Sequence, residues 1–163
     1  MTPPEDEPIW LDEEERQAWA ALVGMLMRLP QALGKQLRRD ANISHFEFSV
    51  LTVLSNSPDQ TMTMSKLAGT VDGSLSRLSQ VVTRMEKKEW VARVPDAQDR
   101  RTTWVQLRPK GRELVDCLAP AHVAVVRQLV IDPLTRAQLR QLTQIGNRIM
   151  QAADPEFELP GYD

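Results

Sequence analysis

The stretch SLSRLSQVVTRMEKKEWVARVPDAQDRR runs from Ser74 to Arg101 and decides the fold. Its first half predicts an amphipathic helix, because apolar residues recur at steps of three and four, at Leu75, Leu78, Val81, Val82 and Met85. Its second half changes to a short β-prone run at 91–94, and a second such run follows at 102–107. The polar segment 95–101 between the two runs predicts a turn. We therefore expect a helix followed by a two-stranded hairpin with a basic tip.

The other face of the predicted helix carries side chains suited to contacts with DNA. Arginines can reach guanine edges or phosphates, and short hydroxyl and amide groups suit backbone oxygens and base edges. The candidate DNA-binding residues of this helix are Ser74, Ser76, Arg77, Ser79, Gln80, Thr83, Arg84 and Lys87. Taken alone, such a face is more often a solvated helix surface. The basic hairpin beside it favours the functional interpretation.

The tip of the predicted hairpin adds a second group of candidate DNA-binding residues. Arg100 and Arg101 would project charge toward a neighbouring phosphate or a narrow minor groove. Asp99 would hold one guanidinium in place through a bidentate pair. Fixing an arginine in this way reduces the entropy that it loses when it binds.

Three helices are predicted upstream of this stretch. Residues 11–39 form a long amphipathic pattern, with a kink or short break expected at Pro30 because proline removes a backbone donor. Ser44 is expected to cap a second helix, and Glu47, three residues later, completes a capping box. A short helix then begins at Thr63 or Met64 and ends in a turn at 71–73.

Two further helices are predicted after the hairpin. A helical region begins near Pro109 and is expected to bend or break near Pro120, and Thr135 caps a last helix that ends at Asp154. The order is four helices, a hairpin and two helices. It predicts a mainly α fold with a small β-hairpin wing, that is, a winged helix-turn-helix.

Composition and charge restrict the possible classes of protein. A chain of 163 residues suits one domain, and its net charge of -2 is divided unevenly, with seven acids and no bases in residues 1–15 but eleven bases and five acids in residues 62–112. The basic middle would attract phosphates. No stretch resembles the ~20 uninterrupted apolar residues of a membrane helix, and the start lacks the features of a secretion signal, so a cytoplasmic protein without membrane contact is expected.

Enzymatic motifs and metal-ligand patterns are not found in the sequence. We see no Gly-rich phosphate loop or nucleophile elbow, and His45 and His122 have no partners at ligand spacing. The single cysteine, Cys117, excludes an intrachain disulfide and lies among apolar residues, which predicts a buried structural thiol. No enzyme, no cofactor and no metal are therefore expected.

The run from Met64 to Gly111 resembles the multiple antibiotic resistance regulator (MarR-type) family. The similarity lies in Leu67-Ala68, in the segment 74–88, in Asp99-Arg100-Arg101 of the wing, and in Leu107 and Gly111 at the wing's exit. Arg108 replaces the threonine of the family's exit motif. The resemblance implies a homodimer whose first and last helices interlock, and it covers nearly the whole chain after the lead-in.

This resemblance gives the domain organisation that we expect. Residues 1–9 are a flexible, acidic and proline-rich lead-in, residues 10–154 form a single domain, and residues 155–163 form a C-terminal tail. Within the domain, residues 10–39 and 109–153 are the dimerisation helices and residues 44–108 are the DNA-binding part. A two-fold dimer would bind the two half-sites of a palindromic double-stranded operator, roughly 34–36 Å apart.

Three hypotheses for function follow. The first is a repressor that a small aromatic or phenolic ligand releases from its operator, as the family suggests, with Trp19, His45 and Phe48 as candidate effector-binding residues beside Phe46. Core packing explains these aromatic residues equally well. The second is a helical dimerisation or protein-interaction module of winged-helix shape that does not recognise specific DNA. The third keeps DNA binding but makes Cys117 an oxidant sensor.

Overall fold

A computed structural model describes residues 9–99 and 101–158. The chain divides into two compact units, Met1–Ala32 and Leu33–Asp163. Helix α1 (Glu13–Ala41) crosses from the first unit into the second. Acidic residues in its first turn and Arg38 and Arg39 in its last turn complement the helix dipole. The helix is continuous through Pro30, so the short break allowed for in the prediction is not present.

The helix-turn-helix part is made by three capped helices. Helix α2 (His45–Asn56) has the predicted capping box, in which the Glu47 amide donates to Ser44 Oγ at 3.1 Å and the Ser44 amide donates to Glu47 Oε2 at 2.8 Å. After a 3₁₀ turn η1 (Pro58–Gln60), α3 (Met64–Thr70) is capped by Thr63, and α4 (Leu75–Lys87) is capped by Ser74. The short polar caps satisfy amides that have no partner inside the helix.

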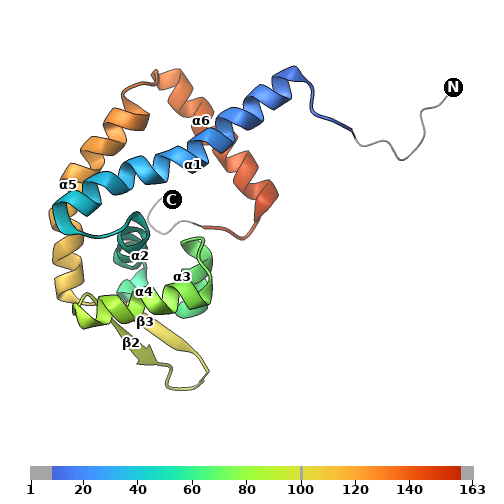
Figure 1. The fold of residues 1–163 in the computed structure, drawn as a ribbon. Helices are drawn as coiled ribbons and strands as arrows, with labels where there is room; N and C mark the ends of the chain where they lie inside the picture. The colour runs from blue at the N-terminus through green and yellow to red at the C-terminus, as the bar shows by residue number, and fades with distance from the viewer. Residues whose placement is uncertain (1–8, 100, 159–163) are drawn as a thin grey trace. The chain divides into compact units, whose positions relative to one another are not determined.

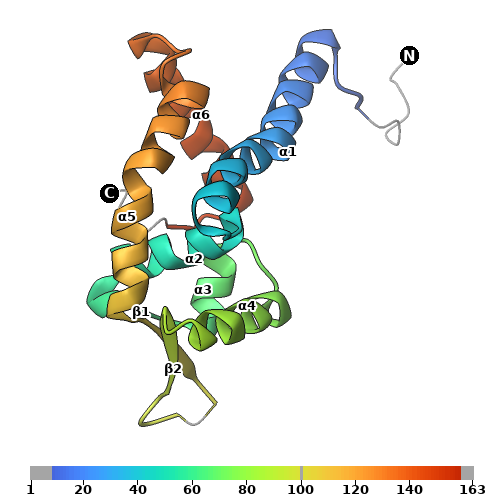
Figure 2. The same cartoon turned by 60° about the vertical axis from the view of Figure 1, so that its left-hand side comes forward.

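The wing contains three strands rather than two. Strands β2 (Val91–Pro95) and β3 (Thr103–Leu107) form the predicted antiparallel hairpin, and β1 (Thr61–Thr63) pairs with the free edge of β3, giving the order β1-β3-β2. Three residues are too few for an alternating pattern to be visible, so β1 could not be predicted. In both views the hairpin extends beyond α4 (Figures 1 and 2).

The core of the second unit lies between α2, α3, α4, the sheet and the start of α5. The predicted apolar side of α4 is buried there at Leu78, Val81, Val82 and Met85. Leu75, the first residue of the helix, is 53% exposed and does not belong to this core. A second cluster joins Leu37, Ile43, Phe48 and Leu118, so the end of α1 packs on α2 and α5.

The C-terminal region contains two helices, as predicted. Helix α5 (Pro109–Val126) is not interrupted at Pro120, and a π-helical turn η2 (Arg127–Ile131) follows it. Helix α6 (Arg136–Ala153) is capped by Thr135 and ends before Asp154, as predicted. None of its residues is buried in the described chain, and its exposed apolar residues are Leu142, Ile145, Ile149 and Met150.

The helical stretch Pro109–Ile131 is long and apolar enough to cross a membrane by length and composition only, and it is not uninterruptedly apolar, since it contains Asp116 and Arg127. The expectation that Cys117 is buried was wrong, because Cys117 is exposed. Its neighbours Val115 and Leu118 face the core, but each residue of an α-helix is turned by about 100° from the one before it, which brings Cys117 to the outer side.

Candidate nucleic-acid interface

The polar face of α4 lies on the surface, opposite the buried side of the helix. At about 100° per residue, Ser76, Gln80 and Lys87 form an exposed stripe opposite the core, and Thr83, which is also exposed, lies as far from the core as Gln80 does. Arg77 and Arg84 lie along one flank of this stripe, and Ser79 and Thr83 lie toward the other. The structure therefore gives the predicted face a centre and two different flanks.

Ser74 has a structural task at the start of this face. Its Oγ accepts a hydrogen bond from the Arg77 amide at 3.2 Å, which caps α4. The hydroxyl proton remains able to donate to a phosphate oxygen beside the positive end of the helix dipole.

The two arginines of α4 are held in place by residues of α2. The Arg77 guanidinium lies over the Phe46 ring, 4.1 Å from the ring centroid. Arg84 Nε lies 3.8 Å from Glu47 Oε1, and Glu47 is the same carboxylate that caps α2. The Arg84 side chain is still 56% exposed, so the contact orients the group without hiding its charge. Consecutive residues of α2 thus orient two cations of α4.

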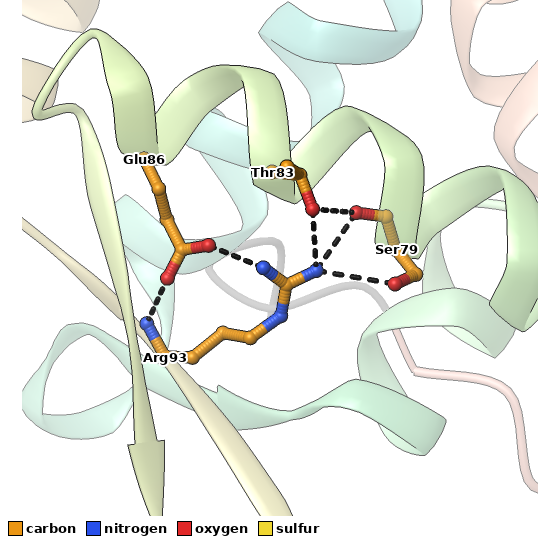
Figure 3. A network of polar contacts seen from close by, with 4 residues as sticks. All are labelled: Ser79, Thr83, Glu86 and Arg93. Atoms are coloured by element: carbon orange, nitrogen blue, oxygen red, sulfur yellow. Dashed lines mark hydrogen bonds and ion pairs between the residues drawn. The ribbon is translucent and has the colours of Figure 1, made fainter.

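The opposite flank of α4 is held by Arg93 of strand β2 (Figure 3). The Arg93 guanidinium forms an ion pair with Glu86, and its other terminal nitrogen donates to the Ser79 carbonyl at 2.8 Å and to the hydroxyls of Ser79 and Thr83 at 3.1 Å each. The Arg93 amide also donates to Glu86 Oε1 at 2.8 Å. Sequence analysis did not single out Arg93, because nothing local distinguishes it from other cations of a β-prone run.

Asp99 organises the backbone of the wing tip. Its carboxylate does not pair with the Arg101 guanidinium, and a pair with Arg100 lies outside the described residues. It accepts instead from the Arg101 amide at 2.9 Å and from the Thr102 hydroxyl at 3.0 Å, so it stabilises the turn. The reason is local, because a carboxylate two residues before an amide closes a tight turn. Arg101 is exposed, and Arg100 lies outside the described residues.

Asp96 is a second organiser of the tip that the sequence did not reveal. It accepts from the Trp104 indole at 2.8 Å and from the amides of Gln98 and Asp99 at 2.8 and 2.9 Å. The Trp104 bond, followed by the two amides, lowers the pKa of the Asp96 carboxyl. The carboxylate form is therefore favoured, and it fixes the turn that presents Arg101.

The effector candidates are only partly brought together. His45 and Phe48 lie around His122 of α5, with ring centroids 6.3 Å and 4.7 Å from the His122 ring, and His122 Nδ1 lies 3.4 Å from the Oε1 atom of the buried Gln36. Burial lowers the pKa of both histidines, and His45 lowers that of His122 further. Trp19 belongs to the first unit and is 58% exposed.

Comparisons with known proteins agree with this geometry. A sequence profile of the MarR family matches residues 43–103. Sco3205, a MarR family transcriptional regulator from Streptomyces coelicolor whose crystal structure is in complex with DNA, shares 36% identity and has a TM-score of 0.85, over 96% of this chain and 98% of that chain. AbsC, a MarR family transcriptional regulator from the same organism, shares 32% identity with a TM-score of 0.82, over 91% of this chain and all of that chain.

A curated relative adds a repressor to this group. The transcriptional repressor MprA of Escherichia coli is 25% identical over 130 residues, which cover 80% of this chain and 73% of MprA. The similarity to Sco3205 and AbsC extends over nearly the whole length of each protein, well beyond the helix-turn-helix. The chain therefore belongs to the MarR family and is a DNA-binding transcriptional regulator with a winged helix-turn-helix fold.

Proposed function

We propose that this regulator is a homodimeric repressor that places α4 of each subunit in the major groove of a palindromic operator. The observation that carries the proposal is the exposed stripe of Ser76, Gln80 and Lys87, opposite the core and between two flanks held by α2 and β2. A rigid helix with a polar outer face fits the major groove. The similarity to a transcriptional repressor favours repression over activation.

The residues of the interface take different roles in this proposal. Gln80 and Ser76 contact base edges, and Gln80 has the amide that pairs with adenine through two hydrogen bonds. The cations Arg77, Arg84 and Lys87 contact phosphates and fix the register of the helix. Arg101, with Arg100 beside it in the sequence, approaches a phosphate or the minor groove from the hairpin tip.

The dimer is supported by the apolar surface that the single chain leaves exposed. Leu142, Ile145 and Ile149 follow one another at steps of three and four along α6, and Val123 and Leu129 are exposed on Pro109–Ile131. Such apolar stripes on a soluble regulator are typical of a subunit interface. Burial against a second copy also accounts for the apolar composition of α5 without a membrane.

The effector remains the small aromatic or phenolic ligand expected from the sequence. The rings of His45, Phe48 and His122 offer stacking surfaces beside the buried Gln36 amide. A ligand here would touch His45 of α2. The two residues that follow His45 orient Arg77 and Arg84. Addition of simple phenols to the operator complex of the wild type and of His122→Ala tests this part of the proposal. Release of the wild-type protein from DNA, together with retention of the variant on DNA, supports it.

The DNA-binding proposal is tested with the purified protein and fragments of its own upstream DNA at about 50 and about 200 mM salt. Contacts to 6–10 phosphates predict a loss in affinity on the order of 10³–10⁵ between these conditions. Arg101→Ala should weaken binding, and Arg140→Ala on the exposed face of α6 serves as the matched control. Weak binding that is the same for every DNA sequence and is unchanged by Arg101→Ala would favour a protein-interaction module instead.

A further inference from the structure

We propose that Arg93 is a positioning residue that locks the wing to the recognition helix, and that Ser79 and Thr83 serve DNA binding through Arg93 and not by touching DNA. This inference rests on the proposed operator binding, because it concerns how the two DNA-binding parts of one chain are held together. It removes two residues from the predicted set of direct contacts and adds one that the sequence analysis did not include.

The first step of the argument is the direction of the Arg93 side chain. Arg93 is a cation of the basic middle segment, yet its side chain is only 27% exposed and runs back along α4 (Figure 3). A guanidinium has five N–H donors in a planar fork, and here the fork spans Glu86 on one side and Ser79 and Thr83 on the other. Both terminal nitrogens of the guanidinium donate to the protein.

The second step is the spacing of its partners. Ser79, Thr83 and Glu86 follow one another at steps of four and three residues, so they form one stripe along α4. Arg93 contacts this stripe over two helical turns and adds a bond from its own amide to Glu86. A contact that extends over two helical turns resists rotation of β2 about α4. A single ion pair would leave this rotation free.

The third step concerns what the hydroxyls can still do. Thr83 is exposed, but its Oγ1 donates to the Ser79 carbonyl at 2.9 Å and accepts from Arg93, so its proton and one lone pair are used inside the protein and it has no proton left for a phosphate oxygen. Ser79 is half-buried beneath the same guanidinium. The exposed stripe of Ser76, Gln80 and Lys87 is left for DNA. The wing angle, and with it the distance from α4 to Arg101, is set by Arg93.

A double-mutant cycle on operator binding separates the two roles of Thr83. The probe is a duplex selected from a random library by the wild-type protein, with a scrambled duplex of equal length beside it. We expect Thr83→Val to weaken binding about 3-fold, Arg93→Lys about 10-fold, and the double variant also about 10-fold, because both changes loosen one contact. A double variant weakened about 30-fold would show independent effects and overturn the proposal.

Two matched controls exclude a general effect of these substitutions. Thr143 on α6 makes the same bond to the carbonyl four residues earlier as Thr83 does, and Arg127 makes an exposed ion pair with Asp132. Thr143→Val and Arg127→Lys should leave operator affinity unchanged. All variants are compared at equal folded fraction from circular dichroism, and Glu86→Gln provides a second route to the same loosened wing if Arg93→Lys folds poorly.

Amide hydrogen exchange tests, in the absence of DNA, whether Arg93 holds the wing to α4. The amides of β2 and of the wing tip should exchange faster in Arg93→Lys, whereas those in the middle of α4 should not change, since their bonds lie inside the helix. Unchanged exchange in the wing overturns the proposal whatever the DNA result. Failure of the wild-type protein to distinguish the selected duplex from the scrambled one would instead refute operator binding, so the two failures are distinguishable.

Discussion

The Arg77 guanidinium lies 4.1 Å from the centroid of the Phe46 ring, and this contact packs α4 against the first turn of α2. The next residue of α2, Glu47, holds Arg84, and the preceding residue, His45, faces His122. One helical turn therefore joins the candidate effector cluster to two cations of the proposed DNA-binding face. An arginine that is already stacked loses less side-chain freedom when it binds a phosphate.

Gly73→Ala should destabilise the protein through this same ring. A Cβ atom at position 73 would lie 2.7 Å from Phe46 Cζ and 2.9 Å from Cε2, so the ring that stacks on Arg77 must shift. We expect the free energy of unfolding to fall by about 1–3 kcal/mol, as in other overpacked sites. Denaturant unfolding measures it. Gly69→Ala is the matched control, because nothing lies within 4 Å of its Cβ position and alanine is the better helix former.

Gln80→Ala should reduce sequence selectivity more than general DNA affinity. Loss of a bidentate contact to a base costs about 1–3 kcal/mol of discrimination, and binding to unrelated DNA should be unchanged because phosphate contacts remain. Fluorescence anisotropy with the selected and scrambled duplexes gives both affinities. Gln144→Ala on α6 controls for the substitution itself. An equal loss on both duplexes would place Gln80 on the DNA backbone.

The histidine pair predicts a loss of stability in weak acid. Burial lowers the pKa of His45 and His122 below the ordinary value of 6.5, so the folded state binds their protons later than the unfolded state. The free energy of unfolding therefore falls as the pH drops below 6.5 and levels off below the folded pKa values. The lowered pKa values of carboxyls such as Asp40 and Asp96 stabilise the fold above their ordinary pKa of 3.8, and this stability is lost only below that value, outside the range of the histidine effect.

Thermal unfolding between about pH 7.5 and about pH 5.5 checks the sign of this effect. His122→Gln keeps a partner for the Gln36 amide but does not titrate, so its Tm should depend less on pH over this range. A variant with the same pH dependence as the wild type would show that other groups are responsible.

Ile145→Glu should dissociate the proposed dimer. Ile145 is 56% exposed in the single chain and lies in the apolar stripe of α6, where a buried carboxylate without a partner is strongly unfavourable. Sedimentation should show a monomer or a much weaker dimer, together with a loss of affinity for the palindromic duplex. Gln144→Glu, one position away on the same helix, adds the same charge outside the stripe. Equal sedimentation of both variants would place the subunit interface elsewhere.

Local interactions were sufficient to predict most elements from the sequence. The capping box of Ser44 and Glu47 and the cap at Thr135 depend on residues at most three positions apart. The buried side of α4 follows from the helical period, since Leu78, Val81, Val82 and Met85 recur on one side of any helix. These features determined the winged helix-turn-helix order before any packing was known.

Only the tertiary structure decided which partners strand β1 and several polar side chains contact, including those of the proposed DNA-binding face. Strand β1 exists because β3 offers it an edge, and Arg93 reaches Ser79 across fourteen residues of sequence. Asp99 turned to the backbone of its own loop, and Cys117 turned outward although its neighbours are apolar. Periodicity gives the side of a helix on which a residue lies but not the partner that packs there. The final direction of a polar side chain depends on donors and acceptors that only folding brings within 3 Å or so.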